Sequence, residues 1–220
     1  MNFADPKVAA VYAGYEARIA AEKPEMDAAF GGPPLPGAAP VDANRFLLPV
    51  GPEVGRFLHA LILARRPRRI LELGTSYGYS TLFLADAARE VGARVVTMDV
   101  ADYKQAYAAE RIAAAGLAGQ VEFRLGDAVA LTAADPGAFD FALLDIWKDL
   151  YLPCFEALYP KLSEEGVIAA DNMIYPDMAR ADVRTYRAAV RAKPDLQTAL
   201  LPIGSGIELS VKWSAGNGKL

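Results

Sequence analysis

From residue 52 onwards, short apolar segments alternate along the chain with longer amphipathic segments. The short segments have the length and the aliphatic composition of buried strands, whereas the longer ones carry apolar residues at helical spacing. Strands that alternate with helices form a parallel sheet with helices on both of its faces. This alternation therefore predicts an α/β fold with a doubly wound sheet.

The pattern contains seven predicted strands and the helices around them. The strands are expected at residues 69–73, 94–99, 121–125, 139–145, 166–171, 196–202 and 206–213. The helices are expected at residues 53–66, 80–91, 102–115, a short stretch after Asp127, 150–162 and 179–192. The short link at residues 203–205 suits a hairpin between the last two strands. We therefore expect a seven-stranded, mostly parallel sheet that ends in an antiparallel hairpin.

The first 44 residues have a different character. Apolar side chains fall at helical spacing over residues 4–30, and Pro24 is expected to break or kink that helix. Residues 31–40, with the sequence GGPPLPGAAP, predict a linker or a loop that passes over the main domain. We therefore divide the chain into an N-terminal helix with a linker, residues 1–44, and one domain, residues 45–220.

Composition narrows the classes of function and location. The chain has 23 Lys and Arg against 27 Asp and Glu, whereas proteins that bind nucleic acid usually have a basic surplus. Its one cysteine, Cys154, forbids an internal disulfide and suits a reducing compartment. The sequence contains no apolar run of membrane-spanning length and no signal-peptide pattern at its start. We expect a cytoplasmic protein without nucleic-acid or membrane partners, and leave a homodimer open.

A glycine-containing loop, LELGTSYGYS at residues 71–80, lies between a predicted strand and a predicted helix. Glycines at such a place let the backbone approach a ligand, and the helix N-terminus favours negative groups. The loop contains the G-x-S-x-G pattern of hydrolases, which need a histidine base later in the chain. The only histidine, His59, precedes the loop. This order argues against a hydrolase.

Two cofactor classes remain for the same loop. The nicotinamide fingerprint G-x-G-x-x-G needs three glycines, but Ser76 and Tyr79 stand at the second and third positions. Binding of S-adenosylmethionine tolerates G-x-x-x-G and needs an acidic residue at the end of the next strand for the ribose hydroxyls. Asp99 is that residue, although it could also cap the following helix, and Asp127 would lie beside the adenine. The ordered set favours S-adenosylmethionine.

Two further predicted strands end in oxygen-bearing side chains. If these strands are neighbours, Asp145 converges with Asp171 and Asn172, and hard oxygen ligands without histidine or cysteine suit Mg²⁺. The alternative roles are a helix N-cap and a turn. Lys148 follows within one helical turn and can act as a base if it is partly desolvated. Trp147 would form a wall of a pocket for an aromatic substrate, or else pack in the core.

Four segments carry a resemblance to a known family: LELGTSYGYST, TMDV, LDIWKDLYLP and ADNMIYP. Together they resemble the class I S-adenosylmethionine-dependent O-methyltransferases, and among these the catechol O-methyltransferases and related cation-dependent enzymes. The resemblance extends over roughly residues 45–213. It implies that Asp145, Asp171 and Asn172 bind Mg²⁺ or Mn²⁺, and that Lys148 takes the proton of the substrate hydroxyl.

The resemblance also implies contacts to the cofactor and the acceptor. The methionine end of the cofactor would be held by Ser80 and the backbone of Val50, with Asp145 near its amino group. The catechol pocket would be walled by Phe46, Trp147 and Pro176. The full set of expected cofactor-binding positions is Val50, Glu72, Gly74, Thr75, Ser76, Gly78, Ser80, Asp99, Asp127, Ala128 and Asp145.

Two positions depart from the catechol enzymes. Ala199 stands where those enzymes carry an acidic residue that grips the second hydroxyl, and Ile146 stands where they have a histidine near the adenine. The sequence predicts Mg²⁺-dependent methyl transfer from S-adenosylmethionine to a hydroxyl of a small, catechol-like aromatic acceptor. The alternatives are a metal-independent methyltransferase and a cofactor-binding protein without turnover.

Overall fold

The computed structural model describes residues 3–30, 42–175 and 180–213. These residues form one seven-stranded sheet. Its strands are β1 (Arg69–Leu73), β2 (Arg94–Asp99), β3 (Val121–Leu125), β4 (Phe139–Leu144), β5 (Leu162–Ala170), β6 (Leu196–Leu201) and β7 (Ile207–Lys212). Their order across the sheet is β3-β2-β1-β4-β5-β7-β6, and β7 pairs antiparallel with both of its neighbours. The mostly parallel sheet and the C-terminal hairpin are thus confirmed.

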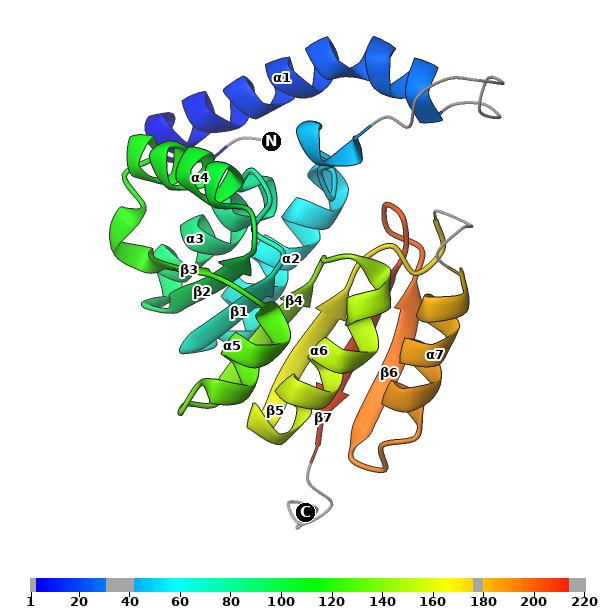
Figure 1. Cartoon of the computed structure of the whole chain (residues 1–220). Coiled ribbons are helices and arrows are strands. Elements are labelled where there is room, and N and C mark those ends of the chain that lie inside the picture. The colour runs from blue at the N-terminus through cyan, green and yellow to red at the C-terminus, as the bar shows by residue number, and fades with distance from the viewer. Residues whose placement is uncertain (1–2, 31–41, 176–179, 214–220) are drawn as a thin grey trace.

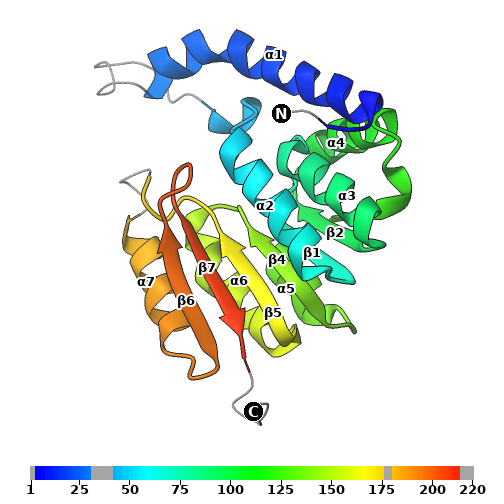
Figure 2. The same ribbon diagram turned by 180° about the vertical axis from the view of Figure 1, so that it is seen from behind.

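Helices cover both faces of this sheet, as Figures 1 and 2 show. Within the described ranges they are α1 (Pro6–Phe30), α2 (Pro52–Arg65), α3 (Tyr79–Val91), α4 (Asp102–Ala114), α5 (Ala128–Ala134), α6 (Tyr151–Leu158) and α7 (Arg180–Arg191). Short 3₁₀ turns lie at Ala43–Arg45, Ala118–Gln120, Lys148–Leu150 and Tyr159–Lys161. One apolar core joins α1–α4 to the sheet, and a second core joins α5–α7 to its other face. The doubly wound arrangement is confirmed.

The carboxyl ends of the parallel strands meet along one rim. The amide of Asp145, just after β4, donates to the carbonyl of Leu73 at the end of β1, at 3.0 Å. The amide of Asp171, just after β5, donates to the carbonyl of Leu144 at the end of β4, also at 3.0 Å. Since β4 and β5 are neighbours, the polar residues that follow them are brought together, as the sequence predicted on that condition.

Strand β5 begins four residues earlier than predicted. Leu162 already pairs with Phe139, and the register then shifts before Val167 pairs with Phe141. The intervening residues are polar, and Glu165 has a φ of 61°, so the strand bulges between the two pairings. The predicted helix over 150–162 instead ends at Leu158 and is followed by a 3₁₀ turn. Because these intervening residues are polar, the sequence pattern did not predict the start of β5 as strand, and the pairing of Leu162 with β4 defines where the strand begins.

Helix α1 is continuous from Pro6 to Phe30, so Pro24 lies inside the helix and does not break it. Side-chain pairs support the helix on both sides of the proline, Arg18 with Glu22 and Lys23 with Asp27. The carboxylate of Glu22 also accepts the backbone amide of Leu47, at 2.8 Å. These contacts offset the one intrahelical hydrogen bond that proline cannot make. The predicted linker at residues 31–40 lies outside the described residues.

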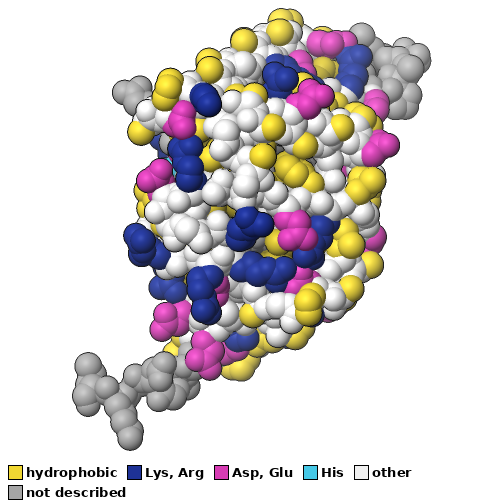
Figure 3. Space-filling view, turned by 90° about the vertical axis from the view of Figure 1, so that its left-hand side faces the viewer, with side chains coloured by type: hydrophobic (Ala, Val, Ile, Leu, Met, Phe, Trp, Pro, Cys, Tyr) yellow, Lys and Arg dark blue, Asp and Glu magenta, His cyan; other side chains and the backbone are white. Residues whose placement is uncertain are grey.

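The surface carries charges of both signs. Figure 3 shows Lys and Arg side chains beside Asp and Glu side chains on the face that lies at the left of Figure 1. None of the described helices combines the length and the hydrophobicity that a membrane span requires. The expected absence of nucleic-acid partners stays a prediction.

A buried carboxylate after α5 links β1 to β3, and it yields a stability prediction. Asp135 accepts two hydrogen bonds from Arg69 and one from Arg124, each at 2.6 Å, and its side chain is fully buried. We expect Asp135→Ala to lower the free energy of unfolding by about 3 kcal/mol, because both guanidinium groups lose their partner. Glu122→Gln, which removes an exposed partner of the same Arg124, should change it by about 0.5 kcal/mol or less. Urea unfolding of both variants measures the difference.

The same ion pairs predict a pH dependence. The hydrogen bonds from Arg69 and then Arg124 hold the pKa of Asp135 well below its usual range. The contribution of Asp135 is therefore fully present above the unfolded-state pKa, near 3.8, and is lost as the pH falls below that value. Equal stability losses for Asp135→Ala and Glu122→Gln at pH 7 would contradict the assignment of this stabilisation to Asp135.

Candidate active site

Asp145 and Lys148 lie together directly after β4. The Nζ atom of Lys148 is 3.6 Å from Oδ1 of Asp145, and it donates to the carbonyl of Ile146 at 2.9 Å. It also donates to the hydroxyl of Tyr151 at 2.7 Å. Tyr151 was not among the predicted site residues. The signal that could have revealed it is its position one helical turn after Lys148 in the same motif.

Asp171 and Asn172 lie at the end of the neighbouring strand, β5. The Asp171 side chain is 1% exposed, and its Oδ1 atom is buried without a hydrogen-bond partner. Asn172 adopts the left-handed conformation with a φ of 58°, which asparagine tolerates better than most residues. Its backbone amide donates to the Asp171 carboxylate and lowers the pKa of that group. A buried carboxylate oxygen that lacks a partner within the protein requires an explanation.

The surroundings of Asp145, Lys148 and Asp171 shift the pKa of each group toward its uncharged form. Burial, together with the negative charge of Asp145, raises the pKa of Asp171 to about 7. Burial also raises the pKa of Asp145 and lowers the pKa of Lys148, although the opposite charges partly offset both shifts. Two carboxylates in a poorly solvated place repel each other, so a cation bound between them would stabilise their ionised forms. Among the described residues, no three His, Cys, Asp or Glu side chains gather at a metal site, so such a cation would need an amide oxygen as well.

The glycine loop between β1 and α3 lies against the same residues. Gly74 has a φ of 101°, and a Cβ atom there would be 2.0 Å from the carbonyl oxygen of Asp145. Gly78 has a φ of 86°, and a Cβ atom there would be 2.8 Å from the Cβ atom of Ala108. Side chains at either position would separate elements that are in contact. The two glycines therefore place the loop directly beside the β4 rim.

A fully buried carboxylate supports this loop from beneath. Glu72 accepts hydrogen bonds from the hydroxyls of Ser80, Thr81 and Thr97, each at 2.6 Å. The hydroxyls of Thr97 and Thr75 lie 2.7 Å apart, which extends the network into the loop. Burial raises the pKa of Glu72 to about 7. Glu72 has no exposed surface, so the structure places it behind Ser80 and Thr75 rather than on the open rim.

The remaining predicted cofactor positions follow β2 and β3. Asp99 accepts the amide of Ser76 at 2.8 Å and that of Ala101 at 2.9 Å, so it supports both the glycine loop and the start of α4. Asp127 caps α5 by accepting the amide of Ala130 at 2.7 Å. Ala128, the first residue of α5, is buried. The sequence left open that Asp99 caps α4, but the N-cap of that helix is Ala101, whose amide Asp99 accepts. A carboxylate that accepts backbone amides keeps further lone pairs for a ligand.

Apolar side chains stand exposed along the same rim, and sequence reasoning had singled out only one of them. Trp147 is 54% exposed, while Val100, Tyr103 and Leu125 are exposed next to the ends of β2 and β3. Ile174 and Tyr175 are exposed beyond β5 and donate their amides to the carbonyl of Ser205. Exposed apolar groups beside a row of polar strand ends suit a ligand with aromatic rings.

The residues predicted to surround the methyl acceptor differ in their exposure to solvent. Trp147 faces solvent, but Phe46 is 1% exposed and lies under the guanidinium of Arg45, whose Cζ is 4.7 Å from the ring centroid. Val50 is also buried, and Pro176 lies outside the described residues. Ala199 pairs with Leu209 on β7 and is exposed. Of the two predicted wall residues that the structure describes, Trp147 lies at the surface and Phe46 is buried.

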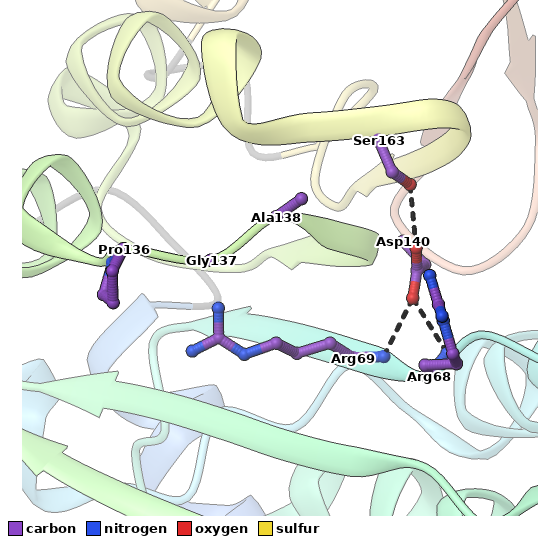
Figure 4. A pocket seen from close by; sticks show the side chains of 7 residues that line it. All are labelled: Arg68, Arg69, Pro136, Gly137, Ala138, Asp140 and Ser163. Atoms are coloured by element: carbon purple, nitrogen blue, oxygen red, sulfur yellow. Dashed lines mark hydrogen bonds between the residues drawn. The ribbon is translucent and has the colours of Figure 1, made fainter.

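A hollow at the opposite end of the sheet is a poor candidate for the site. It is lined by Arg68, Arg69, Pro136, Gly137, Ala138, Asp140 and Ser163, at the amino ends of β1 and β4 (Figure 4). Asp140 accepts the amides of Arg68 and Arg69 and the hydroxyl of Ser163. The Asp140 carboxylate and the Arg69 guanidinium are thus already engaged within the protein, whereas the β4–β5 rim has an unpaired carboxylate oxygen.

Comparisons with known proteins identify the family of this chain. A family model described as O-methyltransferase matches residues 42–213. Caffeoyl-CoA O-methyltransferase 1 of Arabidopsis thaliana is 31% identical over 176 residues, which cover 70% of this chain and 68% of that protein. A catechol O-methyltransferase of Niastella koreensis is 36% identical over 138 residues, covering 60% and 62%.

Solved structures of similar fold include complexes with SAH. The O-methyltransferase of Bacillus cereus in complex with SAH is 26% identical and superposes with a TM-score of 0.69, covering 90% of this chain and 99% of that one. The family match spans the glycine loop, the β4–β5 rim and the hairpin. The chain belongs to the O-methyltransferase family and is a class I S-adenosylmethionine-dependent O-methyltransferase of the caffeoyl-CoA and catechol type.

Proposed function

We propose that this methyltransferase acts on a hydroxyl of a small, catechol-like aromatic acceptor and requires Mg²⁺ or Mn²⁺ held by Asp145, Asp171 and Asn172. The observation that carries the proposal is the buried, unpaired Oδ1 atom of Asp171 beside Asp145. Two carboxylates and an amide form a set of hard oxygen ligands, which suits these cations and not softer metals. The residues present therefore fit the metal that the family resemblance implies.

The protein's own residues would hold the cofactor around the glycine loop. Asp99 would accept the ribose hydroxyls, and Asp127 would lie beside the adenine, with exposed Val100 and Leu125 next to the ring. Ser80 and the backbone of Val50 would hold the methionine end, with Asp145 near its amino group. Glu72 would keep Ser80 and Thr75 in place through its buried hydrogen bonds. The positive end of α3 adds attraction for the cofactor carboxylate.

Lys148 would take the proton from the acceptor hydroxyl. Its burial lowers the pKa of its amine, so more of it is neutral than of an exposed lysine. A bound divalent cation would supply Lewis acidity that favours the deprotonated form of that hydroxyl. The rigid rim would then hold the acceptor oxygen, the methyl carbon and the sulfonium sulfur in line, which removes most of the entropic barrier.

The acceptor class follows from the groups on the rim. Trp147, two residues after Asp145, has an exposed side chain whose indole could stack on an aromatic ring. Two neighbouring hydroxyls on that ring would chelate a cation well. Ala199 offers no acidic group to grip one hydroxyl, so we expect both regioisomers from a simple substituted catechol. The Ala199→Glu variant should shift the isomer ratio.

The direct test is methyl transfer with a panel of phenols. Purified protein, S-adenosylmethionine and Mg²⁺ should yield methylated product from acceptors with adjacent hydroxyls and little from monophenols. Excess chelator should abolish turnover, and Mg²⁺ or Mn²⁺ should restore it. Full activity in chelator would favour a metal-independent methyltransferase, and no product from any acceptor would favour a cofactor-binding protein without turnover.

Asp99 gives a prediction for the cofactor site alone. We expect Asp99→Ala to weaken binding of S-adenosylmethionine by about 1–3 kcal/mol, because charge-assisted hydrogen bonds to the ribose are lost. Asp102→Ala is the matched control, since that exposed carboxylate lies three residues further, in the first turn of α4. Calorimetry without metal or acceptor measures both. Equal affinity of Asp99→Ala and the unmodified protein would contradict the ribose contact.

A further inference from the structure

Tyr151 lies beneath the proposed site and joins three of its segments. The residue begins α6 and is completely buried. Its hydroxyl is 2.7 Å from Nζ of Lys148, 3.0 Å from the carbonyl oxygen of Leu144 and 3.0 Å from that of Asp171. One phenol group thus contacts the proposed base and the ends of both strands that carry the proposed metal ligands.

The hydrogens of these groups can be assigned by their chemistry. A carbonyl oxygen only accepts, so the single phenolic hydrogen points toward the carbonyls of Leu144 and Asp171. The phenolic oxygen must therefore accept from Lys148. The carbonyl of Ile146 accepts a second hydrogen from the same amine, at 2.9 Å. When Lys148 is neutral, both of its hydrogens are engaged, and its lone pair takes the remaining tetrahedral direction.

We propose that Tyr151 is a positioning residue that, with the carbonyl of Ile146, fixes the direction in which the Lys148 amine presents its lone pair. This inference rests on the proposed role of Lys148. Asp145 lies 3.6 Å from Nζ, too far for a hydrogen bond that could hold the amine alone. Without the phenolic oxygen, the flexible lysine side chain would rotate toward that carboxylate.

The chain offers a matched control in Tyr186. The two tyrosine rings contact each other edge to face, with centroids 5.5 Å apart, and both residues are fully buried. The hydroxyl of Tyr186, however, is buried without a hydrogen-bond partner. Tyr186→Phe therefore removes a buried hydroxyl from the same cluster without removing a hydrogen bond.

The first experiment compares Tyr151→Phe with Tyr186→Phe. We expect Tyr151→Phe to lower kcat by about 10- to 100-fold with the KM for S-adenosylmethionine unchanged, because the base is misdirected while the cofactor site is intact. Tyr186→Phe should retain the kcat of the unmodified enzyme. In a Lys148→Met background, Tyr151→Phe should cause no further loss. A Tyr151→Phe enzyme with unchanged kcat, or an equal loss in both backgrounds, would overturn the proposal.

A second replacement separates positioning from simple support of the fold. In 4-aminophenylalanine at position 151, the amino group still donates to both carbonyls but is a poor acceptor for Lys148. This variant should fold like the unmodified protein and still lose kcat as Tyr151→Phe does, which keeps the test decisive if Tyr151→Phe does not fold. Wild-type kcat in this variant would show that the hydroxyl only supports the carbonyls.

A crystal structure of the 4-aminophenylalanine variant gives a readout independent of turnover. Nζ of Lys148 should leave its place between Ile146 and residue 151 and move toward Asp145, and an unchanged position would overturn the proposal. If Lys148→Met retained the wild-type kcat, the proposed role of Lys148 would fail. The crystal structure would then still decide whether Tyr151 holds the amine.

Discussion

Lys148→Met should lower kcat by about 10²–10⁴-fold, the usual cost of removing a general base. Methionine has a similar length and fills the same partly buried space, but it cannot accept a proton. The affinity for S-adenosylmethionine should stay the same, since Lys148 is not among the residues that we expect to contact the cofactor. Steady-state kinetics with a catechol acceptor, together with calorimetry of cofactor binding, measure both quantities.

The residual activity of Lys148→Met should rise with pH. Hydroxide would then replace the lysine, and the acceptor hydroxyl would ionise without help from the protein. Lys193→Met is the control, because that lysine packs on the rings of Phe155 and Tyr159 beyond α7, far along the chain from the rim residues. A Lys148→Met enzyme whose kcat lies within about threefold of the control would exclude Lys148 as the base.

Asp171→Asn should abolish metal-dependent methyl transfer without unfolding the protein. The change keeps the shape of the side chain but removes one of the two charges that would hold the cation. In metal-free protein the loss costs little, because Oδ1 of Asp171 has no hydrogen-bond partner. Activity measured against Mg²⁺ concentration tests the loss of metal-dependent transfer. Thermal unfolding with and without Mg²⁺ tests whether the variant stays folded. The matched control is Asp149→Asn, an exposed carboxylate on the same 3₁₀ turn as Lys148.

The raised pKa of Asp171 gives this prediction a pH signature. Its folded-state pKa, about 7, lies above its ordinary value of 3.8, so the folded state binds the proton more tightly than the unfolded state. The metal-free protein should therefore lose stability as the pH rises from about 4 to about 7, and Asp171→Asn should lose less. Mg²⁺ should raise the melting temperature more at pH 8 than at pH 6. An equal Mg²⁺ effect on Asp171→Asn and the unmodified protein would contradict the metal site.

Much of the fold was already determined by local sequence. The bounds of β1, β2 and β3 are those predicted. β1 and β2 are short, largely aliphatic runs, whereas β3 alternates apolar and charged residues and ends before Gly126. The order of strands and helices identified the doubly wound sheet, and the polar residues after the strands marked the rim on which we propose the site. For β1 and β2 the local pattern suffices because burial on both faces leaves a continuous apolar run.

Other features were decided by contacts between residues distant in the chain. The pairing with β4 sets the start of β5, and packing of α1 carries that helix through Pro24. Position 74 needs glycine because a Cβ atom there would collide with the carbonyl oxygen of Asp145. That contact joins residues 71 positions apart, so the local sequence does not reveal it. The same holds for Tyr151, whose partners come from the ends of β4 and β5 as well as from its own turn.

The sequence by itself determined which residue types stand at the end of each strand, and hence the class of cofactor and the candidate base and ligands. Only the tertiary structure decided that β4 and β5 are neighbours, which places Asp145 and Asp171 in one poorly solvated rim. The physical reason is that strand order and burial depend on the free energy of the whole packed sheet. The sequence gives the identity of Asp171, but its raised pKa and its unpaired oxygen result from the residues that surround it in the fold.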